Sequence, residues 1–540
     1  MMQVPLTLPS FLFRAETLFP KKEIISRTKH GMFRYTYREY AKRTRQLSSI
    51  LRKLGVKRGD HVGTLAWNDH RHLEAYFAIP CMGAVLHTIN LRLSREHIRY
   101  IINHAGDKIL IIDEDLIPII ESMQSELPTV DAYIILSDLD TIPATTLHPV
   151  YSYEALLKEG DPDFLYPDDL DENAPLGMCY TSATTGNPKG VIYSHRGIYL
   201  HSMCLGLVDS CGISETDSIL PVVPMFHVNA WGMPFASVWF GARQVLPGPA
   251  PTPTILVELI AREHVTVAAG VPTVWLGVAQ VLEQTNADIS SLRAILCGGS
   301  AAPRALIETF EQKFGIPFIH AYGMTETTPV ALVSRLKSYH QTLTDSQKLD
   351  IRSKQGLLVP GIEMKILGKS GAVKWDGQEM GELCFRGNWI ADAYYQDDRS
   401  QDAFVDGWLH TGDIGTIDEE GYVKIMDRTK DLVKSGGEWI STVELENTLM
   451  AHPAVFEAAV IGIPHPKWQE RPIACVVLKE GFKNKVEKLE LLNVLQGKFA
   501  KWWIPDDVLF LEEIPKTSVG KFLKRALRDQ LRQYYDNSAE

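Results

Sequence analysis

The chain has 540 residues, more than a single compact core accommodates, so we expect two or more domains. Its hydrophobic content of 45% and charged content of 22% are typical of a soluble globular protein. The net charge of −11 argues against nonspecific binding to nucleic acid or to an anionic membrane surface.

The cysteines and the apolar runs both favour a cytoplasmic protein. The 7 cysteines include no C-x-x-C pair, and an odd number in so long a chain favours reduced thiols over a disulfide framework or a zinc site. No apolar run approaches the roughly 20 residues that span a bilayer, and residues 1–6 lack the basic region of a signal peptide. We therefore expect no integral membrane segment.

Strand-like apolar runs alternate with helical patterns through most of the chain. Helical spacing predicts a helix at 72–82, and short apolar runs predict strands at 60–67, 109–113, 132–136, 266–270 and 294–299. The last two strands end at glycines, as strands do where a ligand approaches the carboxyl edge of an α/β sheet. The alternation predicts an α/β fold with mostly parallel sheets flanked by helices.

The pattern changes near residue 361. Strands separated by short turns at 364–367, 381–386 and 422–426 predict a β-rich subdomain at about 361–427, which completes an N-terminal domain of residues 1–427. Beyond it, a compact α+β domain is expected at 428–540, with helices at 443–450 and 488–499 and strands at 456–463 and 473–478. The charged stretch 427–431 between two apolar strands is the candidate hinge.

The segment 180–190 has the composition of a loop that holds a polyphosphate. Glycine backbone, hydroxyl donors and one lysine charge combine in it, at Thr181, Ser182, Thr184, Thr185, Gly186 and Lys189. It lacks the spacing of the Walker loop. A surface turn rich in serine, threonine and glycine is the alternative, so the interpretation depends on the segments downstream.

The segment 321–328 follows a predicted strand at 317–319. Tyr322 and Gly323 form a flat platform on which a base can stack, and Thr325 offers a donor to a phosphate. Glu326 offers a hard oxygen ligand for Mg²⁺, although a carboxylate at the start of a helix is the alternative.

Two further segments carry ligand-binding chemistry. In 407–413, Asp413 lies in a turn flanked by glycines and is suited to accept both hydroxyls of a ribose, with a simple Asx-turn as the alternative. In 427–441, three cations precede a double glycine that allows close approach to a ligand, and a solvated linker is the alternative; the cations are Arg428, Lys430 and Lys434.

Lys521 follows a glycine near the C-terminus. Most lysines in such positions are solvated. A lysine on a mobile segment can also enter an active site and stabilise developing negative charge.

These segments occur together, in this order and with this spacing, from about residue 20 to residue 530. The chain therefore resembles the acyl-adenylate-forming enzymes, a superfamily of acyl-CoA synthetases, luciferases and peptide-synthetase adenylation domains. Residues 221–232 and 434–441 are most similar to those of bacterial medium- and long-chain fatty acid–CoA ligases.

The resemblance implies a reaction in two steps that uses ATP, Mg²⁺ and coenzyme A. A carboxylate attacks the α-phosphate of ATP to give acyl-AMP and pyrophosphate. The thiolate of coenzyme A then attacks the acyl carbon and releases AMP. A fatty acid is the implied acyl substrate. Related fatty acid enzymes form dimers, so a homodimer is also expected, with residues 1–40 as the candidate contact.

The resemblance also assigns roles to individual residues. Thr181 to Lys189 would hold the β- and γ-phosphates, and Thr181 and Glu326 would lie beside Mg²⁺. Lys521 would stabilise charge during adenylation. The C-terminal domain would then rotate near Asp427 and bring Lys434 and Trp439 toward the thioester chemistry. The remaining residues would contact the nucleotide or adenylate: Gly298, Gly299, His320, Ala321, Tyr322, Thr325, Asp413, Arg428 and Lys430.

Two features concern specificity and departure from the family. His227 and Trp231 lie on an apolar segment where the related enzymes use an aromatic residue to gate a lipid tunnel, although a lone tryptophan there is as often a core residue. Ala183 occupies a position that is usually glycine in the phosphate loop, and a positive φ there would cost of order 1 kcal/mol.

Three alternatives to a fatty acid–CoA ligase stay open. A ligase for aryl or short-chain acids is the nearest. An amino-acid adenylation domain is disfavoured because no acidic residue in 225–235 could pair with an α-amino group. A noncatalytic nucleotide- or acyl-binding protein is disfavoured because Glu326, Asp413, Arg428 and Lys521 are all present.

Overall fold

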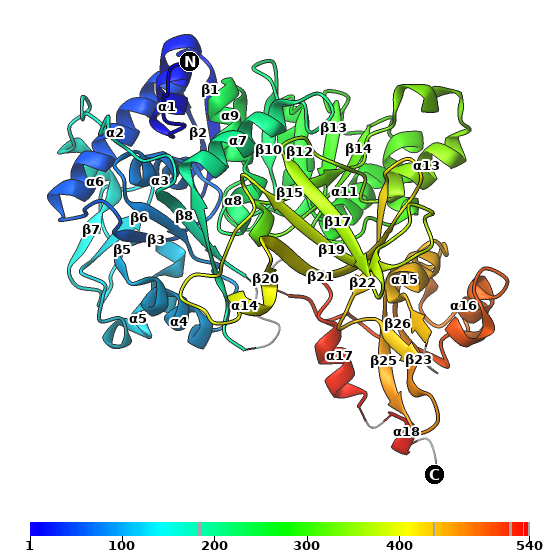
Figure 1. Cartoon of the computed structure of the whole chain (residues 1–540). Helices are drawn as coiled ribbons and strands as arrows, with labels where there is room; N and C mark the ends of the chain where they lie inside the picture. The colour runs from blue at the N-terminus through cyan, green and yellow to red at the C-terminus, as the bar shows by residue number, and fades with distance from the viewer. Residues whose placement is uncertain (182–185, 436–437, 518–520, 533, 538–540) are drawn as a thin grey trace.

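The computed structural model describes residues 1–181, 186–435, 438–517, 521–532 and 534–537. Figure 1 shows an N-terminal region built from two neighbouring sheet-and-helix units, with a small C-terminal unit beside and below them. Among the described residues, no helix combines the length and the apolar character that crossing a membrane requires.

The first large sheet has the order β7-β6-β5-β3-β4-β8-β9, and each neighbouring pair is parallel except β8–β9. Helices cover both faces, with α2, α3 and α6 above and α4 and α5 below in Figure 1. The strands are β3 (His61–Leu65), β4 (Val85–Thr88), β5 (Asp107–Asp113), β6 (Ala132–Leu136), β7 (Val150–Ser152), β8 (Pro175–Tyr180) and β9 (Gly190–Ser194). The helices are α2 (Tyr37–Lys53), α3 (His70–Cys81), α4 (Arg95–Ala105), α5 (Ile117–Glu121) and α6 (Tyr153–Lys158).

The second large sheet has the order β16-β15-β14-β13-β12-β10-β11-β1-β2. It is parallel from β14 to β1 and antiparallel at both ends. Its strands are β1 (Glu23–Thr28), β2 (Gly31–Thr36), β10 (Ser218–Pro221), β11 (Arg243–Leu246), β12 (Val267–Gly270), β13 (Ala294–Cys297), β14 (Phe318–Gly323), β15 (Val330–Val333) and β16 (Leu357–Leu358). The accompanying helices are α1 (Pro9–Leu18), α7 (His195–Gly206), α8 (Val228–Trp231), α9 (Met233–Phe240), α10 (Pro253–Arg262), α11 (Pro272–Gln284), α12 (Arg304–Glu308) and α13 (Asp345–Ser353).

The β-rich subdomain is an antiparallel sheet that packs below the second large sheet in Figure 1. Its elements are β17 (Ile362–Gly368), β18 (Gly371–Ala372), β19 (Gly381–Gly387), α14 (Ser400–Ala403), β20 (Phe404–Val405), β21 (Trp408–Ile417) and β22 (Val423–Arg428). The expected α/β class, with mostly parallel sheets and a β-rich subdomain, is therefore confirmed.

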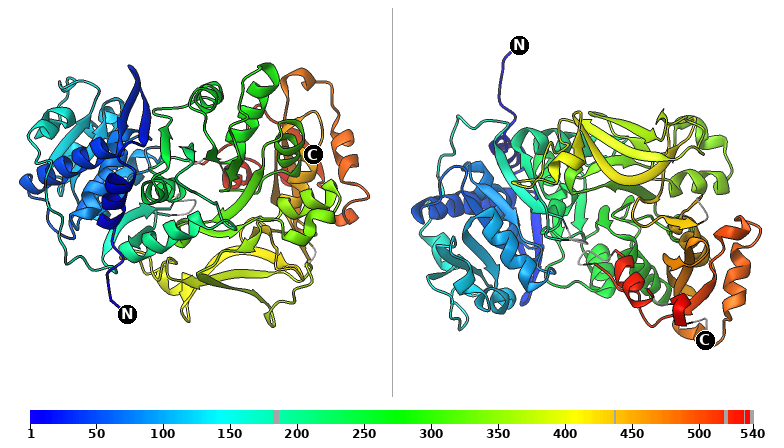
Figure 2. Two further views of the ribbon diagram at one scale, coloured as in Figure 1. Left: turned by 90° about the horizontal axis from the view of Figure 1, so that it is seen from above. Right: turned by 60° about the horizontal axis from the view of Figure 1, so that its bottom comes forward.

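The C-terminal unit is an α+β structure in which α15 and α16 pack against its own sheet. Figure 2 shows this unit, in orange and red, lying against the green part of the N-terminal region. Its elements are β23 (Val433–Ser435), β24 (Glu438–Ile440), α15 (Thr442–Met450), β25 (Val455–His465), β26 (Gln469–Leu478), α16 (Lys488–Leu495), β27 (Asp507–Phe510), α17 (Lys524–Gln530) and α18 (Tyr534–Asn537).

One predicted boundary is wrong in this unit. Periodicity predicts a helix at 488–499, but α16 ends at Leu495. Gly497 adopts φ +81°, a left-handed conformation that stops an α-helix, and the following apolar residues pack from irregular backbone instead.

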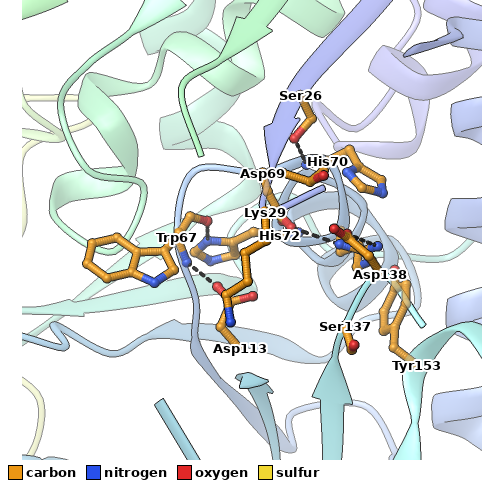
Figure 3. A network of polar contacts seen from close by, with 12 residues as sticks. Ser26, Lys29, Trp67, Asp69, His70, His72, Asp113, Ser137, Asp138 and Tyr153 are labelled. Carbon is orange, nitrogen blue, oxygen red and sulfur yellow. Dashed lines mark hydrogen bonds and ion pairs between the residues drawn. The ribbon is translucent and has the colours of Figure 1, made fainter. Parts of the chain in front are cut away.

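A buried acidic network lies at the carboxyl edge of the first sheet, among residues to which the sequence analysis assigned no function (Figure 3). The Asp113 carboxylate, at the end of β5, accepts a hydrogen bond of 2.6 Å from the backbone of Trp67. Asp69 caps α3 by accepting a hydrogen bond of 2.9 Å from the backbone of His72. Burial and the nearby Asp69 carboxylate raise the pKa of Asp113 well above its ordinary value.

This pKa shift predicts that Asp113→Asn stabilises the protein. A carboxyl whose pKa is higher in the folded state is penalised when it ionises, so stability falls as the pH rises from the unfolded pKa toward the folded one. The amide retains the acceptor for Trp67 and carries no charge. We expect the free energy of unfolding to rise by about 1 kcal/mol at pH 7 and to match wild type below pH 4. Urea titrations at both pH values measure this, and a loss of stability at pH 7 would contradict it.

Candidate active site

A cavity of about 550 Å³ opens where the second large sheet, the β-rich subdomain and the C-terminal unit meet. Most predicted site residues line it, although they come from segments separated by more than three hundred positions. Those residues are Thr181, Lys189, His227, Trp231, Gly298, Gly299, Ala321, Tyr322, Thr325, Glu326, Arg428, Lys430 and Lys521. An adjoining cavity of about 280 Å³ shares several of them and adds His320 and Asp413.

The two ends of the phosphate-loop segment are tied together by the β8–β9 hairpin. The backbone of Thr181 donates to the carbonyl of Lys189 at 2.9 Å, and the backbone of Lys189 donates to the Thr181 hydroxyl at 3.2 Å. Gly186 is exposed and lies beside Arg399. The predictions for Ser182, Thr184 and Thr185, and the expected strain at Ala183, lie outside the described residues.

A tyrosine that no motif indicated joins the loop to the predicted metal ligand. The Tyr394 hydroxyl donates to the buried Glu326 carboxylate at 2.7 Å. The Lys189 ammonium lies 3.8 Å from the centre of the Tyr394 ring, which is within range of a cation–π contact. Tyr394 therefore places the loop lysine and the acidic side chain at one end of the cavity. The neighbouring Thr325 is held there because its carbonyl accepts from Tyr193 at 2.9 Å.

Asp413 forms the centre of a polar cluster in the adjoining cavity. One carboxylate oxygen accepts from the Tyr322 hydroxyl at 2.6 Å, and the other accepts from Arg428 Nε at 3.1 Å. Asp413 and Arg428 face each other across the β21–β22 pair. The Asp413 carboxylate raises the pKa of Arg428, so the two groups remain an ion pair. This geometry presents a carboxylate and a guanidinium beside a flat tyrosine ring, as binding of a nucleoside requires.

His320 lines the smaller cavity, and both of its ring nitrogens are already engaged by backbone groups. Its Nε2 accepts from the backbone of Ala302 at 3.3 Å, and its other ring nitrogen lies 3.2 Å from the carbonyl of Ser353. Burial lowers its pKa to about 4, so the ring is neutral. The glycines nearby are needed for space, because a Cβ added to Gly298 would lie 2.8 Å from the carbonyl oxygen of Ala321.

An unusual backbone conformation positions the apolar side of the cavity. Val228, Asn229, Ala230 and Trp231 adopt φ values of 46°, 50°, 47° and 59°, a left-handed turn that continues into Gly232. A left-handed conformation costs roughly 1–2 kcal/mol for each residue other than glycine or asparagine, so surrounding packing must stabilise the turn. The turn sets the Trp231 ring beside Gly298 and Gly299.

His227 precedes this turn and is partly buried in the wall of the cavity. Burial, followed by the charges of Lys521 and Arg92, lowers its pKa to about 3. The imidazole is therefore neutral and cannot supply a positive charge to a bound anion at neutral pH. A neutral ring can still donate one hydrogen bond and accept another.

Lys521 reaches the cavity from the C-terminal unit. Its Cε lies 3.8 Å from the position that a Cβ on Gly299 would occupy. Burial and the Arg428 charge lower its pKa to about 8. By contrast, Lys434 and Trp439 face each other across β23 and β24, and neither of these described residues lines the cavity. The structure thus brings together Lys521 and the nucleotide-side residues, and it leaves Lys434 exposed outside.

Comparisons with known proteins agree with this geometry. A long-chain-fatty-acid–CoA ligase of Thermus thermophilus is 50% identical, with 99% of this chain and 97% of the relative covered. A medium-chain-fatty-acid–CoA ligase of Ectopseudomonas oleovorans is 42% identical, with 98% and 97% covered. A crystal structure of an anthranilate CoA ligase with anthranoyl-AMP superimposes with a TM-score of 0.88 at 25% identity, with 99% of each chain covered.

The family models cover both parts of the chain. The model described as "AMP-binding enzyme" matches residues 12–395, and the model described as "AMP-binding enzyme C-terminal domain" matches residues 444–521. The first match alone spans well over half of the chain. The chain is therefore a member of the AMP-binding enzyme family.

Proposed function

We propose that the chain is an ATP-dependent fatty acid–CoA ligase for medium to long acyl chains. The observation that carries the proposal is the convergence of Glu326, Asp413, Arg428 and Lys521 on adjoining cavities whose apolar side carries Trp231. The names of the relatives that share 50% and 42% of their residues with the chain support the acyl class.

In the first step, a carboxylate oxygen of the fatty acid attacks the α-phosphorus of ATP and pyrophosphate leaves. Asp413 and Arg428 hold the ribose, and Ala321 and Tyr322 bound the adenine. Thr325 lies near the α-phosphate, and Lys189 faces the β- and γ-phosphates. Lys521 supplies a positive charge where negative charge accumulates on the reacting oxygens.

The donor set at the other end of the cavity fits Mg²⁺. The Glu326 carboxylate and the Thr181 hydroxyl are hard oxygen ligands that line the same cavity, and Mg²⁺ is bound through few protein oxygens together with phosphates. When bound, the ion neutralises phosphate charge. Lys189 and Tyr394 fix the position of this end of the cavity.

In the second step, the thiolate of coenzyme A attacks the acyl carbon and AMP leaves with the carbonyl–phosphate oxygen. Lys434 and Trp439 contribute after the C-terminal domain, residues 428–540, rotates about 427–431. The buried Asp427 carboxylate supports a pivot there, because it accepts from the backbone of Thr442 at 2.9 Å and so joins β22 to α15.

Chain-length profiling tests the acyl class. AMP release that depends on coenzyme A is measured with acetate, butyrate, octanoate, dodecanoate, hexadecanoate and benzoate. We expect kcat/KM to be highest among the acids from octanoate to hexadecanoate, because each buried methylene contributes about 0.8 kcal/mol. Relatives named as 3-methylmercaptopropionyl-CoA and benzoate–CoA ligases, at 42% and 33% identity, favour the alternative of short or aryl acids. A maximum on butyrate or benzoate would support that alternative and overturn the proposal.

The lowered pKa of Lys521 predicts an alkaline limit to adenylation. The ammonium loses its proton as the pH rises through about 8, so kcat/KM for ATP falls about tenfold per pH unit above that value. The fall in kcat begins at a higher pH, because bound phosphates favour the charged lysine.

Lys521→Arg provides the control for this prediction, because a guanidinium keeps its charge to a pH above 12. The alkaline limb of the pH profile of ATP-dependent adenylation therefore disappears in this variant, whatever its absolute rate. A limb that stays near pH 8 in Lys521→Arg would show that another group titrates.

Two further predictions from the sequence stay part of the proposal. The cysteine content supports a cytoplasmic location, and the resemblance to dimeric fatty acid enzymes supports a homodimer. Light scattering of the purified chain measures the second directly.

A further inference from the structure

A cluster of three different ligand types lies at the rim of the larger cavity. Cys384 and Glu382 are two residues apart on β19, and His410 faces Cys384 across the β19–β21 pair. One ligand atom from each residue lies within 4.8 Å of the other two. His410 Nδ1 is 3.5 Å from the Cys384 sulfur and 2.9 Å from the Glu382 carboxylate.

These separations match a tetrahedral ion of zinc size. Zinc lies about 2.3 Å from sulfur and about 2.0–2.1 Å from nitrogen, which separates the two ligand atoms by about 3.5 Å. The Cys384–His410 distance has that value without any movement. The Glu382 carboxylate oxygen needs to move about 0.5 Å away from His410 Nδ1, because two ligand atoms bound to one zinc ion lie farther apart than two atoms joined by a hydrogen bond.

The cluster is buried on the side of Cys384 and open to the cavity on the side of Glu382 and His410. Cys384 is fully buried, whereas the side chains of Glu382 and His410 are 29% and 22% exposed and line the cavity. An ion can therefore enter from the cavity and keep one position for water or substrate, as zinc sites with three protein ligands do.

We propose that Glu382, Cys384 and His410 bind a borderline-soft divalent ion of the zinc type, separate from the Mg²⁺ that accompanies ATP. A thiolate and an imidazole select zinc, cobalt or copper over Mg²⁺, which prefers oxygen ligands. On binding, the Cys384 thiol releases its proton to solvent in the cavity, and a lone pair of the thiolate sulfur bonds to the ion.

The site is positioned to affect the nucleotide. The second Glu382 oxygen accepts from the backbone of Gly412 at 2.9 Å, and Gly412 precedes Asp413. The Thr411 hydroxyl donates to the carbonyl of Leu383 at 2.8 Å. Because the same carboxylate holds the 411–413 turn and the ion, bound metal shifts the residue that faces Tyr322 and Arg428.

The spacing of these residues in the sequence does not indicate a metal site. The sequence analysis expected no zinc site because no cysteine belongs to a C-x-x-C pair. Twenty-five residues separate Cys384 from His410 in the chain, and the antiparallel register of β19 and β21 alone makes them neighbours.

Cobalt spectroscopy on the full chain without nucleotide tests the proposal. Co²⁺ bound to a thiolate has a sulfur-to-metal absorption band in the near ultraviolet, which Mg²⁺ cannot produce or remove. We expect wild type to gain this band, and stoichiometric Zn²⁺ to abolish it. Cys384→Ser removes the band and weakens Zn²⁺ binding by roughly 10-fold or more. The matched control Cys475→Ser, which changes a buried cysteine in the C-terminal unit, keeps both.

His410→Gln decides the question if Cys384→Ser does not fold. This variant retains the thiol and loses the imidazole, so the band shifts and Zn²⁺ affinity falls. A wild-type chain without the band, or a band that persists unchanged in Cys384→Ser or His410→Gln, overturns the proposal. None of these readouts requires ligase activity, so they are independent of the proposed function.

Discussion

Lys521→Ala is expected to slow formation of acyl-AMP by ~10²–10³-fold, the effect of removing one group that stabilises charge in a transition state. Lys521 reaches the cavity from the C-terminal unit. Its Cε and the Trp231 ring each lie 3.8 Å from the position that a Cβ on Gly299 would occupy. Pyrophosphate release from ATP and a fatty acid, without coenzyme A, measures this step alone.

The same variant leaves the second step intact. Thioester formation from chemically prepared acyl-AMP and coenzyme A proceeds at the wild-type rate, because the proposal assigns that step to Lys434 and Trp439. Lys516→Ala is the matched control, since Lys516 lies on the same segment but pairs with Glu457 at 2.7 Å. Equal losses in both half-reactions, or a similar loss in Lys516→Ala, would show that Lys521 has a structural role only.

Asp413→Asn is expected to lower kcat/KM for ATP by about 10–100-fold. The variant removes the charge that faces Arg428 and weakens the acceptor for the Tyr322 hydroxyl. Hydrogen bonds to charged groups contribute about 1.5–3 kcal/mol. The Arg428 side chain is 44% exposed, so solvent screens its interaction with Asp413 and the expected loss of binding free energy does not exceed this range. Steady-state kinetics with ATP and the fatty acid varied separately measure it.

The loss should appear in KM for ATP and leave KM for the fatty acid unchanged. Asp418→Asn is the control, because Asp418 also pairs with a cation, Lys354, directly follows the last residue of β21 and does not line either cavity. An unchanged KM for ATP in Asp413→Asn, or a larger effect in Asp418→Asn, would refute the assignment of Asp413 to the ribose.

Local patterns predicted the elements well where burial and spacing decide the structure. The strand expected at 132–136 coincides with β6, and those expected at 266–270 and 294–299 correspond to β12 and β13. Fully buried strands read as short apolar runs bounded by turn residues, so they need no tertiary information.

Features that depend on register or strain were not predictable in this way. Tyr394 reaches Glu326 because two distant segments pack together, and no composition signal marks that tyrosine. Three of the four residues in the left-handed turn at 228–231, all but Asn229, disfavour positive φ, so local propensity predicts the opposite conformation. Tertiary packing imposes both features, and both lie at the cavity.

The residue roles were predictable only in part. The resemblance assigned the nucleotide-side residues, and the structure brings Tyr322, Asp413 and Arg428 into one cluster. It could not indicate that both nitrogens of His320 are engaged, or that the His227 ring is neutral, because these properties follow from burial and from partners remote in sequence.

Isotope transfer tests the central claim, that the carboxylate attacks the α-phosphate of ATP, most directly. A fatty acid labelled with ¹⁸O in both carboxylate oxygens is incubated with the protein, ATP and coenzyme A, and the nucleotide product is examined by mass spectrometry. The proposed reaction transfers a carboxylate oxygen to AMP, so AMP becomes heavier by a single ¹⁸O and pyrophosphate stays unlabelled. Unlabelled AMP, or ADP with label in inorganic phosphate, would contradict an acyl-adenylate intermediate.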